Sequence, residues 1–156
     1  MEVSVSRKSA APRPKSGLNG TVVTGAPKAT TPWDYDLNWY KSWPDVASTY
    51  QSAQAQVAAG DRSGAAATYK TLLVDTRSFV AQDAAFQAAR LELAMGDTAG
   101  ALATVEKGLR RSSANTPFRS QLLSFKADLL TMAGDGAAAS AARNEASRLN
   151  LERQDQ

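Results

Sequence analysis

Apolar side chains recur at helical spacing through most of the chain after residue 45. Between Phe118 and Met132 they step by four, three, four and three residues, which places them along one face of an α-helix. Thr116 and Pro117 precede this stripe and are typical of a helix start. The pattern predicts helices over residues 45–59, 62–75, 79–95, 98–111, 117–133 and 136–151, with Phe86, Phe125 and Leu129 in the core.

The chain repeats a Gly-Asp pair three times. Gly60-Asp61, Gly96-Asp97 and Gly134-Asp135 each follow one predicted helix and open the next, at spacings of 36 and 38 residues. Glycine can close a helix in the left-handed conformation, and aspartate can cap the helix that follows. Small side chains at fixed distances from each glycine let two helices approach closely. Alanine fills these positions, seven residues before and five residues after each glycine: Ala53, Ala89, Ala127, Ala65, Ala101 and Ala139.

This arrangement resembles the tetratricopeptide repeat, in which small residues flank a Gly-Asp-like turn at a period of about 34 residues. The large residue of that family's first helix is replaced here by Thr49, Ala85 and Leu123, so we carry over none of its peptide-binding residues. The resemblance implies an all-α fold, a short TPR-like α-solenoid of three antiparallel helical hairpins over residues 45–152. It also implies a module that binds other proteins.

Residues 1–32 differ from the rest of the chain in composition. Serine, proline, glycine, alanine and threonine dominate, and such a segment cannot bury enough apolar surface to fold alone. It holds five basic side chains against Glu2, a net charge of +4, whereas residues 33–156 carry −1. We therefore expect an extended basic N-terminal arm at 1–32, an aromatic anchor segment at 33–44 and the helical hairpins after it.

All three tryptophans and two of the four tyrosines fall within residues 33–44. Tryptophan and tyrosine are enriched in binding hot spots, so the segment could anchor a partner. Alternatively it could fold back and cap the end of the first repeat, or contact a membrane interface beside its basic flank. The candidate partner-binding residues are Trp33, Tyr35, Trp39, Tyr40 and Trp43, together with Arg7, Lys8, Arg13 and Lys15 of the arm.

The sequence offers few side chains suited to catalysis or metal binding. The chain has no cysteine and no histidine, which excludes thiol catalysis, disulfides and metal sites built from thiolate or imidazole. Asp34 and Asp36 form the one close carboxylate pair and lack a loop of further oxygen ligands. Arg110-Arg111-Ser112-Ser113 resembles a kinase site, but we interpret its arginines as cations at a helix C-terminus. We expect no enzyme, no cofactor and no metal.

These features favour a non-catalytic protein–protein interaction module. We expect an accessory or scaffolding subunit that stabilises a larger multiprotein assembly, with the arm and the Trp-rich segment docked on a neighbour. The alternatives are a free peptide-binding adaptor and a membrane-surface binder; five dilute basic residues favour a nucleic-acid partner less. No apolar run is long enough for a secretory signal or a bilayer span, which predicts a cytoplasmic protein, or one peripheral to a membrane complex.

Overall fold

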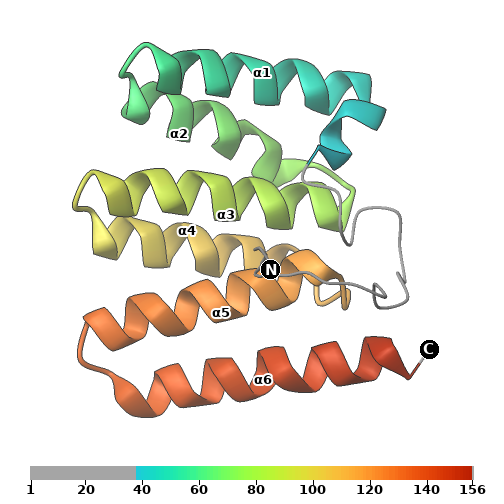
Figure 1. The fold of residues 1–156 in the computed structure, drawn as a ribbon, viewed down its shortest axis with the longest axis vertical. Helices are drawn as coiled ribbons and strands as arrows, with labels where there is room; N and C mark the ends of the chain where they lie inside the picture. The colour runs from blue at the N-terminus through green and yellow to red at the C-terminus, as the bar shows by residue number, and fades with distance from the viewer. Residues whose placement is uncertain (1–37, 156) are drawn as a thin grey trace, which may run out of the picture. The chain divides into compact units, whose positions relative to one another are not determined.

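The computed structural model describes residues 38–155, and every regular element in this range is helical. The all-α class is therefore confirmed for the described part of the chain. Each helix packs against the next one along the chain, α3 also packs against α5, and Figure 1 shows them following one another in chain order. The elements are η2 Trp39–Ser42, α1 Pro44–Ala58, α2 Arg62–Lys70, η3 Thr71–Val74, α3 Ser78–Ala94, α4 Thr98–Arg111, α5 Pro117–Met132 and α6 Gly136–Gln154.

Helix boundaries agree with the sequence prediction to within one residue, except at the ends of α2 and α6. The predicted helix over 62–75 changes at Thr71 into the short 3₁₀ helix η3. The Thr71 hydroxyl donates to the Thr68 carbonyl at 2.7 Å, and Asp75 then turns into extended backbone. Hydrogen bonds of the 3₁₀ type tighten a last helical turn, which explains the early end of α2. The last helix, α6, runs three residues further than predicted, to Gln154.

The three Gly-Asp turns share one backbone geometry. Gly60, Gly96 and Gly134 have φ angles of 83°, 83° and 84°, as the left-handed helix ending requires. In the second turn, the Gly96 N–H donates to the Leu93 carbonyl and the Asp97 N–H to the Glu92 carbonyl, both at 2.9 Å. The other two turns have the same pair of hydrogen bonds. This is the Schellman ending, and the predicted role of the glycines is confirmed.

The aspartates cap the following helices, as predicted. The side chains of Asp61 and Asp97 accept from the backbone N–H of Gly64 and Gly100 at 2.8 Å. A side chain at either glycine would collide with the capping carboxylate, so the short contact depends on glycine there. Ala138 occupies the equivalent position of the third turn, where the N–O distance to the cap is 3.1 Å.

Small residues let the helices pack closely. The six alanines at fixed distances from the turn glycines are all buried, with at most 1% of their surface exposed. Gly108 of α4 provides a further close approach, because a Cβ there would lie 2.6 Å from the Ala85 Cβ and 3.0 Å from Leu122 Cδ1. The centre of the core thus lies where α3, α4 and α5 meet.

The large apolar residues of α5 are buried in part only. Leu122 and Leu129 are fully buried, and Phe118 is nearly so. Phe125 and Phe86 are half-buried and meet edge to face, with ring centroids 5.4 Å apart, so they line the margin of the core. Met132 is 61% exposed, because the last residue of α5 extends past the packed helices into the turn. Phe118, Leu122 and Leu129 are buried as the stripe predicts. Phe86 and Phe125, predicted in the core, only pack against it, and the prediction is wrong for Met132.

Candidate functional site

The structure describes three of the nine candidate residues. Trp39 and Tyr40 lie in η2, and Trp43 directly precedes α1. Trp33, Tyr35, Arg7, Lys8, Arg13 and Lys15 lie outside the described residues, as do the whole of the predicted arm and the Asp34–Asp36 pair.

Trp39 is buried among aromatic rings from three helices. Only 5% of its surface is exposed, and its ring centroid lies 5.7 Å from that of Tyr50, 5.5 Å from Phe79 and 5.3 Å from Phe118. These rings come from α1, α3 and α5, so the tryptophan joins helices that are far apart in sequence. Its aromatic surface is used inside the chain.

Tyr40 is buried beside Trp39, with 6% of its surface exposed. Its ring stacks on Tyr50 with centroids 4.7 Å apart, and Gln54 Nε2 donates to its hydroxyl at 2.9 Å. Trp39 and Tyr40 therefore pack inside the chain, against rings of α1, α3 and α5.

A buried carboxyl group lies at the centre of this aromatic cluster. Asp83 of α3 is 3% exposed and accepts a hydrogen bond of 2.5 Å from the Tyr50 hydroxyl. Burial raises the pKa of Asp83, and hydrogen bonds from Tyr50, Gln87 and Trp39 oppose the rise. Burial and the neighbouring Asp83 also raise the pKa of Tyr50. The carboxyl connects η2 and α1 to α3.

The raised pKa of Asp83 predicts that stability falls as pH rises. The folded chain holds this proton more tightly than the unfolded chain, whose aspartates titrate near about 3.9. The contribution to stability is present below that value and is lost as pH rises towards the folded pKa. Asp83→Asn keeps an acceptor for Tyr50 and cannot ionise, so its stability relative to the parent chain should increase between pH 4 and pH 8.

Urea unfolding at several pH values measures the difference in unfolding free energy between the variant and the parent chain. The other titrating groups are the same in both chains, so their contributions cancel. Asp128→Asn is the control, because Asp128 is an exposed aspartate of α5. Parallel pH profiles for the parent chain and Asp83→Asn would show that Asp83 titrates alike in the folded and unfolded states.

Trp43 differs from the two aromatic residues before it, because it is only half-buried. Its ring lies 5.3 Å from that of Phe79, and the Arg77 guanidinium sits over it at 5.4 Å. Arg77 is itself bound to Asp75 at 2.8 Å and to Asp45 at 2.5 Å. These hydrogen bonds lower the pKa of both carboxyl groups and raise that of Arg77. Trp43 is thus a partly exposed aromatic side chain on a fixed support.

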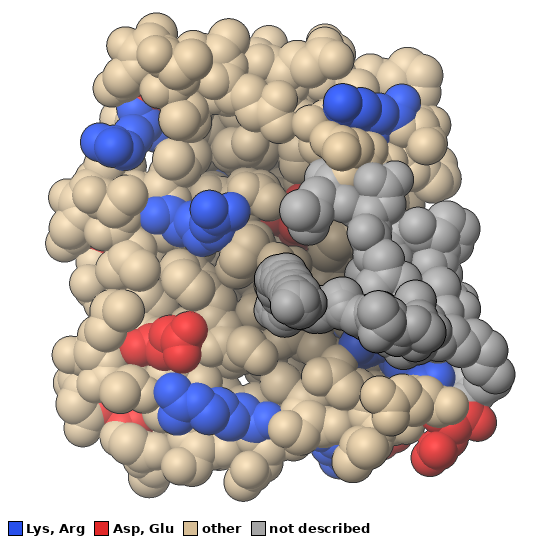
Figure 2. All heavy atoms as spheres, viewed as in Figure 1, with Lys and Arg blue, Asp and Glu red and all other residues tan. Residues whose placement is uncertain are grey.

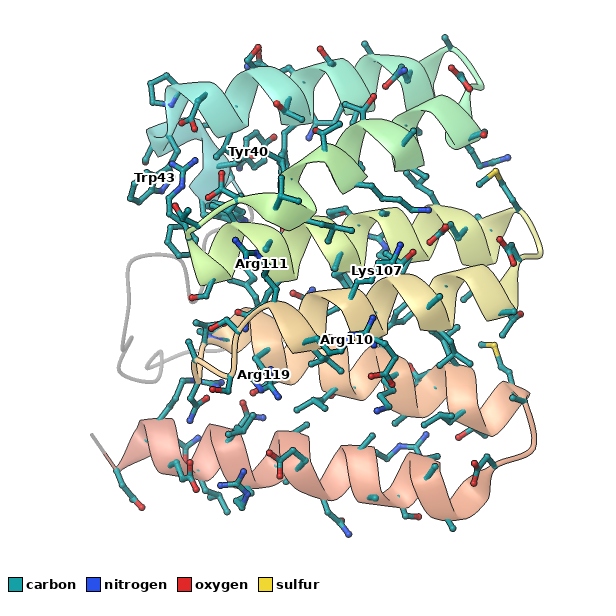
Figure 3. All side chains as sticks on the ribbon, turned by 180° about the vertical axis from the view of Figure 1, so that it is seen from behind. Tyr40, Trp43, Lys107, Arg110, Arg111 and Arg119 are labelled. Carbon is teal, nitrogen blue, oxygen red and sulfur yellow. The ribbon has the colours of Figure 1, made fainter. Side chains whose placement is uncertain are left out.

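A second feature is a group of four cations, Lys107, Arg110 and Arg111 of α4 and Arg119 of α5, which we call the α4 basic surface. Figure 3 shows all four on the side of the chain opposite to that of Figure 1. Residues at i, i+3 and i+4 share a helix face, so the three cations of α4 lie close together. The face seen in Figure 2 is mostly uncharged, with its cations in separate patches.

Arg110 and Arg111 lie in the last turn of α4, so their prediction as cations at a helix C-terminus is confirmed. Arg111 donates to the carbonyls of Val74 at 3.1 Å and Asp75 at 3.2 Å, at the end of η3. Arg119 instead binds the end of α4, donating to the carbonyls of Leu109 at 3.0 Å and Ser112 at 2.6 Å. The spacing of Lys107, Arg110 and Arg111 was the signal that could have revealed the surface.

The buried polar residues of α3 have partners within the chain. Thr116 donates to Gln82 at 2.6 Å, and Glu92 accepts from Lys70 and Thr104, both at 2.5 Å. These contacts join α3 to α2, α4 and the start of α5. Within residues 38–155 no group of three or more acidic side chains is arranged to hold a metal ion. In the same range no helix is both long and apolar enough to cross a bilayer.

Comparisons of the chain with protein-family models, with curated proteins and with solved structures find no match.

Proposed function

We propose that the chain is a non-catalytic protein–protein interaction module, an accessory or scaffolding subunit that stabilises a larger multiprotein assembly. In this proposal the helices form a short TPR-like solenoid of three antiparallel hairpins. The Trp-rich segment and the basic arm dock on a neighbouring protein.

The three equivalent turns support the repeat architecture. Each has a left-handed glycine, a Schellman ending and an aspartate cap, and each is flanked by buried alanines. Stacked helical repeats bury one set of faces against their neighbours and leave extended surfaces for binding. The buried polar groups of α3 support a non-catalytic role, because their hydrogen bonds connect helices to one another.

The half-buried ring of Trp43 carries the docking proposal. Hot spots are enriched in tryptophan, and a side chain already held in place loses little conformational entropy on binding. Phe79 and Arg77 hold Trp43 in this way, and Asp75 and Asp45 in turn hold Arg77. Trp39 and Tyr40 secure the chain just before it, so a partner would meet an ordered surface.

Trp43→Ala tests this proposal. In the full chain it should weaken association with the native assembly by about 2 kcal/mol, the size of a hot spot. Deleting residues 1–32 should also weaken association while leaving the melting temperature nearly unchanged, since a proline-rich polar segment contributes little packing. Quantitative mass spectrometry of cross-linked material from the native source measures the association of both variants, with Leu151→Ala as an exposed apolar control.

Association that survives both changes would contradict docking through this segment. Binding to anionic vesicles that is lost with Trp43→Ala and at high salt, without loss of a protein partner, would support the membrane-surface alternative instead.

A further inference from the structure

The four cations of the α4 basic surface form no ion pair with a carboxylate of the described residues. The charges of Arg111 and Arg119 help to lower the pKa of Asp75 and of Glu145, but each of these carboxylates pairs with another cation, as does Glu106. Glu106 pairs with Lys126 at 2.6 Å, Asp75 with Arg77 at 2.8 Å, and Glu145 with Arg148 at 2.6 Å. Within residues 38–155, no carboxylate lies within ion-pair distance of Lys107, Arg110, Arg111 or Arg119. Residues 33–156 carry a net charge of −1, so this surface is positive in a part of the chain that is slightly negative as a whole.

Two of the four cations are held in place by backbone carbonyls. Arg111 is fixed to the end of η3 and Arg119 to the end of α4. A carbonyl oxygen accepts a hydrogen bond without cancelling the positive charge, and a guanidinium has five N–H groups, so donors remain for a ligand. Fixed guanidinium groups suit carboxylates because less side-chain freedom is lost on binding. Lys107 and Arg110 are exposed beside them.

An exposed apolar side chain adjoins the cations. Val74 is 77% exposed, the largest exposure among the large apolar residues that the structure describes. The bond from Arg111 Nη2 to the Val74 carbonyl places the two residues side by side. A nucleic-acid surface typically combines a basic track with exposed aromatic rings that stack on bases. Cations beside an aliphatic side chain fit a peptide that combines carboxylates with an apolar residue.

We propose that the α4 basic surface and Val74 bind an acidic peptide segment of a protein partner, with its carboxylates on Lys107, Arg110, Arg111 and Arg119 and an apolar side chain on Val74. This inference rests on the proposed function, since it names the chemistry of a partner. It assigns that partner to a surface distinct from Trp43.

The test titrates the full ¹⁵N-labelled chain with a synthetic ten-residue peptide of glutamates around a central leucine. Amide signals of residues 107–113 and of Val74 should shift. Lys107→Glu/Arg110→Glu should raise the Kd at least tenfold, because it reverses two of the four charges. Arg62→Glu/Arg90→Glu makes the same change in net charge at exposed positions of α2 and α3, and should leave the Kd within about twofold. Lys107→Gln/Arg110→Gln should weaken binding without placing acidic groups near the end of α4.

Val74→Ser tests the apolar contact separately. It should weaken binding of the leucine peptide and leave binding of a peptide with alanine in its place unchanged. Equal loss in the two charge-reversed variants would overturn the proposal, since the attraction would then be general. It would also be overturned if anionic vesicles or a single-stranded oligonucleotide shifted residues 107–113 while the peptide did not. Native association that survives Lys107→Glu/Arg110→Glu but is lost with Trp43→Ala would overturn this inference and leave the proposed function standing.

Discussion

Replacing Trp39 with alanine is expected to lower the free energy of unfolding by about 3–5 kcal/mol, as for other large buried aromatic residues. The indole is 5% exposed and contacts rings of α1, α3 and α5, so its removal leaves a cavity among helices from all parts of the described chain. It also removes a hydrogen bond to buried Asp83. Urea unfolding monitored by circular dichroism measures the change.

Trp43→Ala is the matched control, since both residues are tryptophans of the same segment. Trp43 is half-buried against Phe79 and Arg77, and its loss should cost clearly less stability than the loss of Trp39. Equal costs at the two positions would contradict the division of the segment into a buried anchor and a partly exposed docking residue.

Leu122→Ala is expected to cost about 2–5 kcal/mol. Leu122 is fully buried on α5, and its Cδ1 would lie only 3.0 Å from a Cβ at Gly108, so it packs closely against α4.

Leu151→Ala provides the comparison for Leu122. Leu151 is 62% exposed on α6, and changes at such positions are usually within about 0.5 kcal/mol. Thermal or urea unfolding of both variants is sufficient. A loss below about 1 kcal/mol for Leu122→Ala would show that α5 does not pack on α4 as described.

The features that could be predicted from sequence are those with local causes. A left-handed glycine and the aspartate after it act through hydrogen bonds that span no more than five residues, so the three turns were predictable. The helix boundaries and the buried alanines follow from the same repeated signal. Phe118, Leu122 and Leu129 follow from the 3.6-residue period of a single helix.

The features that sequence did not predict depend on distant partners. Tyr50 and Asp83, whose hydrogen bond connects α1 to α3, are 33 residues apart in sequence. No local pattern shows that Gln82, Asp83 and Glu92 are buried, because each is polar and finds its partners on other helices. The burial of Trp39 beside the partial exposure of Trp43 has the same origin, so sequence alone left the cap and the docking site as alternatives.

The α4 basic surface depends both on a local sequence pattern and on contacts between residues distant in sequence. The spacing of Lys107, Arg110 and Arg111 is local and visible in the sequence. Arg119 joins them because it binds the end of α4, and Val74 because η3 ends beside Arg111. Neither contact follows from periodicity.

The most direct test of the proposed function is the stoichiometry of the full chain in its native source. The chain, tagged at its C-terminus and expressed at its natural level, would be purified under native conditions, and its mass would be measured together with the identities of co-purifying proteins. We predict a complex with at least one other polypeptide in fixed ratio, which Trp43→Ala depletes while the variant itself remains folded. A monomer with no partner in fixed ratio, from both the parent chain and a cross-linked sample, would contradict a role as an accessory or scaffolding subunit.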